Sequence, residues 1–100
     1  MKVVFSFNAK HKLQLIYDYY FFQASEKVAF KIINDILAKI ELLKTTPHIG
    51  SHEELLKDEK IEYKKLISGN YKIIYHLDGA VFIDTIFDCR QEPDKILKEL

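Results

Sequence analysis

The sequence predicts a single α+β domain in which an antiparallel helical hairpin packs on an antiparallel β-sheet. Residues 9–24 and 26–44 repeat their apolar side chains at steps of three and four, the period of a helix that buries one face. From residue 61 the period changes to two and is interrupted at Gly69-Asn70 and Asp78-Gly79-Ala80, as in a β-meander. A chain of 100 residues, 48% of them hydrophobic, suffices for one core only. We therefore expect one domain over residues 1–100.

The N-terminal half is expected to form a short strand over residues 2–8, ended by Asn8, and then two helices. Ser25 is expected to cap the second helix, because its hydroxyl can accept a hydrogen bond from a free backbone amide. Pro47 cannot continue a helix, so the second helix should end near Lys44. The apolar stripes are Leu13, Ile16, Tyr17, Tyr20 and Ala24 in the first helix, and Ala29, Ile33, Ile36, Ile40 and Leu43 in the second.

The C-terminal half is expected to form a three-stranded antiparallel meander, whose register follows from two uncharged rows of side chains that should face the helices. The rows align if the second loop has three residues and pairs Leu77 with Val81, with Gly79 or Ala80 absorbing a bulge. The expected strands are 63–68, 71–77 and 81–87, and the rows are Tyr71, Ile73, Tyr75 and Leu77 on one strand and Val81, Ile83, Thr85 and Phe87 on the next.

This register gives the sheet a second face with more apolar side chains than a solvated face normally carries. Either the C-terminal segment, a short helix with Ile96, Leu97 and Leu100 at helical spacing, folds over this face, or another chain does, or both contribute. The residues assigned to the second face are Lys65, Ile67, Lys72, Ile74, His76, Phe82, Asp84, Ile86 and Asp88.

Charge and cysteine content narrow the class of protein. Fifteen acidic and fifteen basic residues balance, so we expect no direct sequence-specific DNA binding. Cys89 is the single cysteine, which excludes an internal disulfide, and no residue pattern suggests a metal ion or other cofactor. Charged residues interrupt every apolar stretch, so no membrane span is expected, and we expect a cytoplasmic protein.

The order and spacing of several motifs resemble the RelE/ParE toxin superfamily along nearly the whole chain. The most specific parts are the strand with a glycine turn and two tyrosines, and the last strand, which ends in an arginine and a proline. The motifs are Pro47-His48-Ile49-Gly50, Tyr63-Lys64-Lys65-Leu66, Gly69-Asn70-Tyr71-Lys72-Ile73-Ile74-Tyr75 and Val81-Phe82-Ile83-Asp84-Thr85-Ile86-Phe87-Asp88-Cys89-Arg90-Gln91-Glu92-Pro93.

The resemblance implies the toxin of a type II toxin-antitoxin pair, with roles in growth inhibition and plasmid stabilisation, neutralised by a cognate antitoxin. It also implies one of two targets. ParE-like members inhibit DNA gyrase without nuclease chemistry, whereas RelE-like members cut messenger RNA on the ribosome. A non-toxic family member that acts as a binding module is a third possibility.

The residues favour the ParE-like branch. RNA cleavage needs an acid and a base as well as cations, and no His or Tyr follows His76, although nucleases of the superfamily commonly place one near the C-terminus. Lys72 also stands where the family often has an arginine, and lysine cannot bind phosphate bidentately. If the protein were a nuclease, its catalytic residues would be Lys65, Lys72, His76 and Arg90.

Two groups of residues are candidates for protein contacts. Tyr19 and Phe22 should be exposed aromatics on the first helix, and Arg90 is the single arginine, which either binds the target or forms an ion pair with Asp88, Glu92 or Asp94. The candidate target-binding residues are Lys65, Lys72, Arg90, Tyr19 and Phe22, and the candidate antitoxin-binding residues are Ile67, Ile74, Phe82 and Ile86.

Overall fold

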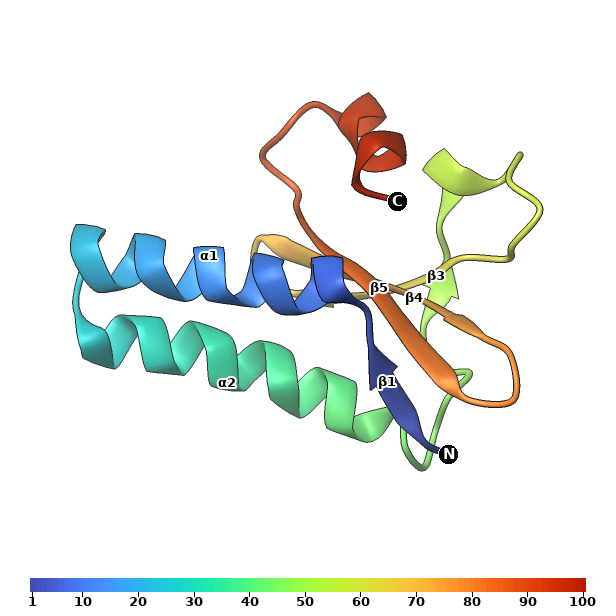
Figure 1. Cartoon of the computed structure of the whole chain (residues 1–100), viewed down its shortest axis with the longest axis horizontal. Helices are drawn as coiled ribbons and strands as arrows, with labels where there is room; N and C mark the ends of the chain where they lie inside the picture. Colours follow the sequence, from blue (N-terminus) through green and yellow to red (C-terminus); the bar gives the residue numbers. More distant parts are fainter.

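The computed structural model describes residues 1–100 and confirms the expected α+β architecture, with a helical hairpin lying against a five-stranded sheet (Figure 1). The strand order is β1-β5-β4-β3-β2, and β1 is parallel to β5 whereas the other neighbours are antiparallel. No helix has both the length and the apolar character needed to cross a bilayer. The elements are β1 (Val3–Phe5), α1 (Phe7–Gln23), α2 (Glu26–Leu42), β2 (Ser51–His52), β3 (Lys64–Ser68), β4 (Tyr71–Leu77) and β5 (Val81–Asp88), with 3-10 helices η1 (Glu54–Leu56) and η2 (Pro93–Glu99).

Side-chain caps set where the two long helices begin. Ser25 caps α2 as expected, since its Oγ accepts a hydrogen bond from the amide of Val28 at 3.1 Å. Helix α1 begins two residues before the expected start, because Ser6 caps it by accepting from the amide of Ala9 at 2.9 Å. Asn8 therefore lies inside the helix and does not end the strand.

The hairpin between β4 and β5 has the expected three-residue loop, with Leu77 paired to Val81 and Gly79 at a φ of 70°. The register then shifts between Ile74 and Tyr75, where Asp84 is an extra residue on β5. One extra residue reverses which side chains face the helices. The faces predicted for the residues of β5 after Asp84 were therefore wrong.

The correction moves four side chains to the opposite faces of the sheet: Thr85, which pairs with Ile74 and so leaves the helical face, and the three residues that follow it. Ile86 pairs with Ile73 and Asp88 pairs with Tyr71, so both lie on the face that packs against the helices. Phe87 pairs with Lys72 and lies on the other face, where it joins a second apolar cluster. The residues predicted for the open face therefore do not all share it.

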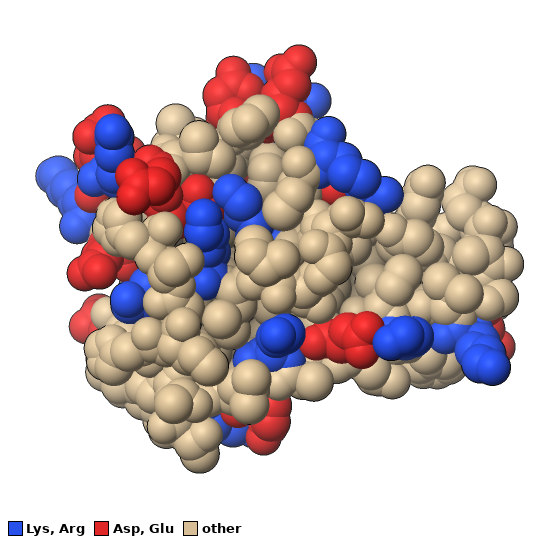
Figure 2. Space-filling view, turned by 180° about the vertical axis from the view of Figure 1, so that it is seen from behind, with Lys and Arg blue, Asp and Glu red and all other residues tan.

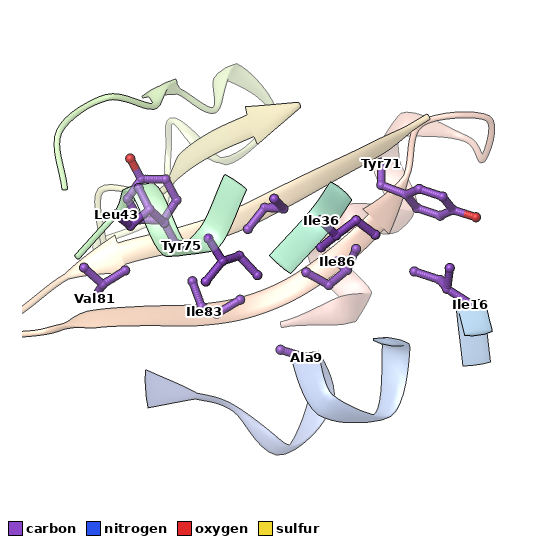
Figure 3. Packing of buried hydrophobic residues seen from close by; sticks show 11 residues of the cluster. Ala9, Ile16, Ile36, Leu43, Tyr71, Tyr75, Val81, Ile83 and Ile86 are labelled. Carbon is purple, nitrogen blue, oxygen red and sulfur yellow. The ribbon is translucent and has the colours of Figure 1, made fainter. Parts of the chain in front are cut away.

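The core has two parts, one on each face of the sheet. The larger part lies between the helical hairpin and the sheet and includes Ile36, Tyr75 and Ile83 (Figure 3). The smaller part comprises Leu56, Ile74, Phe87 and Ile96, and is closed by the segments that contain η1 and η2. The C-terminal segment thus covers this part of the second face, as one of the expected alternatives had it, although Leu97 and Leu100 remain exposed.

We expect Ile96→Ala to lower the free energy of unfolding by about 2–4 kcal/mol, since the side chain is fully buried and its loss leaves a cavity over the sheet. Denaturant unfolding would measure the change. Leu97→Ala, next in sequence but half exposed, is the matched control and should change stability far less. Equal losses in the two variants would contradict the role of Ile96 as an anchor.

Candidate target-binding site

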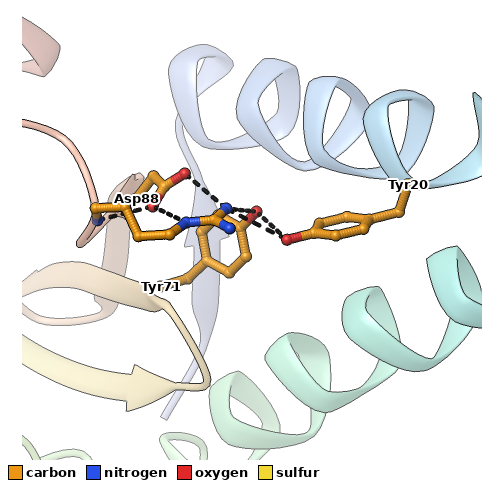
Figure 4. Close-up of polar contacts among 4 residues, drawn as sticks. Tyr20, Tyr71 and Asp88 are labelled. Atoms are coloured by element: carbon orange, nitrogen blue, oxygen red, sulfur yellow. Dashed lines mark hydrogen bonds and ion pairs between the residues drawn. The ribbon is translucent and has the colours of Figure 1, made fainter. Parts of the chain in front are cut away.

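Arg90 lies just beyond β5 and is held by the carboxylate of Asp88. Its Nε donates to Asp88 Oδ1 at 3.0 Å, its Nη2 to Oδ2 at 2.9 Å, and its backbone amide to Oδ1 at 2.9 Å. Nη2 also approaches the hydroxyls of Tyr20 and Tyr71 at 3.3 and 3.4 Å (Figure 4). The ion pair with Asp88, one of the two expected roles for Arg90, is therefore present, and it fixes the direction of the guanidinium.

These contacts fix the charges at this end of the sheet. The hydrogen bonds from Arg90 outweigh partial burial and hold the pKa of Asp88 below its usual value, so Asp88 is an anion at neutral pH. Burial, followed by the hydrogen bond with Tyr20, raises the pKa of Tyr71, so that its hydroxyl stays protonated and donates to Tyr20 at 3.2 Å. The cluster thus presents one cation and one anion beside the hydroxyls of Tyr20 and Tyr71.

A cleft of about 360 Å³ lies beside this cluster, between α1 and the end of β5. Arg90 and Tyr19, which the sequence had proposed as target contacts, both line it. Lys12, also on its wall, is paired with Glu99 of η2 at 2.7 Å and so connects α1 to the C-terminal segment. The cleft combines apolar walls with a fixed cation, which suits a protein surface that carries both an apolar and an acidic side chain.

Lys65 and Lys72 lie at a different place, around the carboxylate of Glu53. Lys72 Nζ donates to both Glu53 oxygens at 3.2 and 3.0 Å, and Lys65 Nζ lies 3.9 Å from Oε2. Glu53 is only 1% exposed, whereas both lysines reach partly into solvent. The two lysines are therefore neutralised on one side by a buried acid.

His76 pairs with Asp84, the extra residue of β5. His76 Nδ1 lies 2.6 Å from Asp84 Oδ2, and the imidazole stacks on Phe82 with ring centroids 5.1 Å apart. Burial raises the pKa of Asp84 and the contact with His76 partly offsets this. Lys72 and His76 are four residues apart along β4, about 13 Å at the rise of a strand, so they do not converge on one substrate atom.

The surface of the hairpin carries the expected exposed aromatic residues. Tyr19 is 55% and Phe22 is 79% exposed. Figure 2 shows that the hairpin end is largely uncharged when seen from behind, with basic and acidic side chains along its lower edge. Phe22 does not line the cleft, so the structure groups Tyr19 with Arg90 and leaves Phe22 apart.

The four residues proposed for antitoxin contact differ in accessibility. Ile67 is 47% exposed and Phe82 is partly exposed, so both can meet another chain. Ile74 and Ile86 are buried, Ile74 under the C-terminal segment and Ile86 against the helices. The prediction that these two side chains lie on the surface was wrong. The C-terminal segment covers Ile74, and the bulge at Asp84 turns Ile86 toward the helices.

Sequence reasoning missed Lys12, Tyr20 and Glu53 as parts of these sites. Tyr20 was assigned to the core, and its hydroxyl nevertheless reaches Arg90 from α1. Glu53 lies in a stretch rich in charge, where no local pattern marks one carboxylate as buried. The tyrosine in the motif Gly69 to Tyr75 and the glycine in Pro47 to Gly50 were both noted, but their contact, Gly50 N–H to Tyr75 hydroxyl at 2.9 Å, was not foreseen.

Comparison with known proteins identifies the class. A protein-family model described as "ParE toxin of type II toxin-antitoxin system, parDE" matches residues 3–93. The chain therefore belongs to the ParE toxin family of type II toxin-antitoxin systems, and the resemblance to the RelE/ParE superfamily is confirmed on its ParE-like side.

A solved structure of the same fold is the chromosomal ParDE toxin-antitoxin system from P. aeruginosa. It superposes with a TM-score of 0.74 and 19% sequence identity, over 88% of this chain and 95% of that one. At this identity the likeness shows the fold alone. No curated protein matches the sequence.

Proposed function

We propose that this protein is a toxin that inhibits DNA gyrase by binding it, without catalysis, and that a cognate antitoxin neutralises it. The proposal that the protein acts without catalysis is supported by how the four candidate catalytic residues are paired. Each of them contacts an acid: Arg90 pairs with Asp88, Lys65 and Lys72 share Glu53, and His76 contacts Asp84. A nuclease site requires such groups to converge on one phosphate and to be free to exchange protons.

The proposed contact with the target centres on the cleft beside Arg90. Tyr19 and Arg90 combine an exposed aromatic ring with a fixed guanidinium, the residue types that dominate binding energy at protein interfaces. Phe22 on the hairpin, and Lys65 and Lys72 on the other side of the sheet, would lie at the margin of this contact. The proposed antitoxin contacts are reduced to Ile67 and Phe82, which remain accessible.

We expect Arg90→Ala to raise the concentration needed for half-inhibition of gyrase supercoiling by about tenfold or more, because it removes the cation and frees Asp88. Lys95→Ala, an exposed basic residue close by in η2, is the matched control and should inhibit like the unchanged protein. A thermal melt would check that both variants fold. Full inhibition by Arg90→Ala would remove Arg90 from the interface.

Further assays of the unchanged protein distinguish gyrase inhibition from the two alternative functions. If the protein cleaves messenger RNA on translating ribosomes and leaves gyrase supercoiling intact, it is a RelE-like endoribonuclease and not a gyrase inhibitor. Normal growth on expression without an antitoxin would leave only a non-toxic binding module. Restoration of supercoiling when the antitoxin is added would support the partner proposed here.

A further inference from the structure

Helix α1 has a second apolar face that the fold does not use. Its inner face, with Ala9, Leu13, Ile16 and Tyr20, packs into the main core. Its outer face carries a row at steps of four, four, four and three, which we name the α1 stripe. At 1.5 Å per residue the row is about 22 Å long. The α1 stripe consists of Phe7, His11, Leu15, Tyr19 and Phe22.

The α1 stripe is strongly exposed. Phe7 is 86%, Leu15 48% and Phe22 79% exposed, and His11 is exposed as well. The ring of Phe7 stacks on His11, itself in the stripe, with parallel planes and centroids 6.4 Å apart. Monomeric proteins seldom leave a contiguous apolar row of this length in water, and one that persists marks a surface for another chain.

The order of residues in the stripe is nearly symmetrical about Leu15, with Phe7 eight residues before it and Phe22 seven after it. His11 precedes and Tyr19 follows Leu15 by four residues, and the two ends are both phenylalanines. A two-fold axis through Leu15 would place it on its own copy, His11 on Tyr19 of the second copy, and Phe7 on Phe22 of the second copy. A two-fold interface requires this self-complementarity, whereas an unrelated helix does not.

Polar side chains beside the stripe agree with an antiparallel pair. Asp18 borders it on the same side as His11, and its carboxylate accepts only the local bond from Gln14 at 2.9 Å. In the antiparallel arrangement Asp18 faces His11 of the second copy, twice per interface. The chain has a formal net charge of zero, so no long-range repulsion opposes association.

We propose that the free protein forms a homodimer in which the α1 stripes of two copies pack antiparallel. The dimer does not rest on the function proposed above. Because Leu15 and Tyr19 belong to both the stripe and the cleft beside Arg90, the dimer hides part of that cleft, and a target that binds there competes with the second copy.

Sedimentation of the whole protein over a concentration series tests the dimer, with the cognate antitoxin absent. The unchanged protein should approach twice the chain mass as its concentration rises. Leu15→Glu brings two carboxylates together on the two-fold axis and should raise the dissociation constant by at least about tenfold. Leu37→Glu makes the same change at a residue 39% exposed on α2 and should leave the dimer unchanged.

Disulfide cross-linking tests whether Leu15 of one copy lies against Leu15 of the other. Leu15→Cys, made together with Cys89→Ser, should cross-link into a dimer under mild oxidation, whereas Leu37→Cys in the same background should not. A single monomeric mass at every concentration, or a dimer that persists undiminished in Leu15→Glu, would overturn the proposal. So would a stripe that becomes protected from hydrogen exchange only when the antitoxin is added.

Discussion

We expect Glu53→Ala to lower the free energy of unfolding by about 2–3 kcal/mol. Glu53 is 1% exposed, and its carboxylate receives Lys72 at 3.0 Å and Lys65 at 3.9 Å. Removing the acid leaves two ammonium groups partly buried without a partner. The loss falls short of that for a fully buried pair, because both lysines can turn toward water. Denaturant unfolding measures this loss of stability, provided that the unfolding free energy falls with denaturant concentration at the same slope in both proteins.

Two variants separate charge pairing from simple truncation. Glu54→Ala changes the neighbouring, exposed glutamate and should alter stability by less than about 0.5 kcal/mol. Lys72→Ala made in the Glu53→Ala background should cost less than the same change in the unchanged protein, since the pair is already broken. Strictly additive losses would show that Glu53 and Lys72 do not stabilise one another.

We expect Gly50→Ala to destabilise the protein by about 3 kcal/mol, and to lower the yield of folded protein. A Cβ at this position would lie 2.4 Å from the Tyr75 hydroxyl and 2.7 Å from the backbone oxygen of Lys65. The first atom belongs to a ring that is fully buried in the core, and the second to the sheet, so neither can move without disturbing its surroundings. A thermal melt followed by circular dichroism would show the fall in midpoint.

The identity of the clash can be tested with Tyr75→Phe. On its own this change removes the hydroxyl that donates to the backbone oxygen of Pro47 and accepts from the amide of Gly50, both at 2.9 Å, and should cost about 1–2 kcal/mol. Combined with Gly50→Ala it should restore only part of the stability, because the Lys65 oxygen remains in the way. Full rescue would assign the whole effect to the hydroxyl.

The elements were predictable where the signal is local. Ser25 caps its helix through a neighbouring amide, and the three-residue loop at Gly79 sets the pairing of Leu77 with Val81. The bulge was not predictable, because its causes are distant in sequence. Ser6 donates to the backbone oxygen of Asp84, 78 residues later, at 2.8 Å.

The candidate site was predictable in its chemistry and not in its geometry. The single arginine and the exposed Tyr19 were recognised from residue type and helical spacing. That they share one cleft depends on the approach of α1 to the end of β5, which no local pattern encodes. The bulge also decides that Asp88 lies on the helical face, where it can orient Arg90.

The parallel pairing of β1 with β5 joins the beginning of the fold to its end. Val3 lies opposite Val81, and no other strand borders β1. During synthesis, β1 thus has no neighbour until β5, at residues 81–88, has been made, and contacts so far apart in sequence form slowly. The cleft beside Arg90 exists only after β5 emerges, so the nascent chain cannot engage a target through it before residues 81–90 have been made.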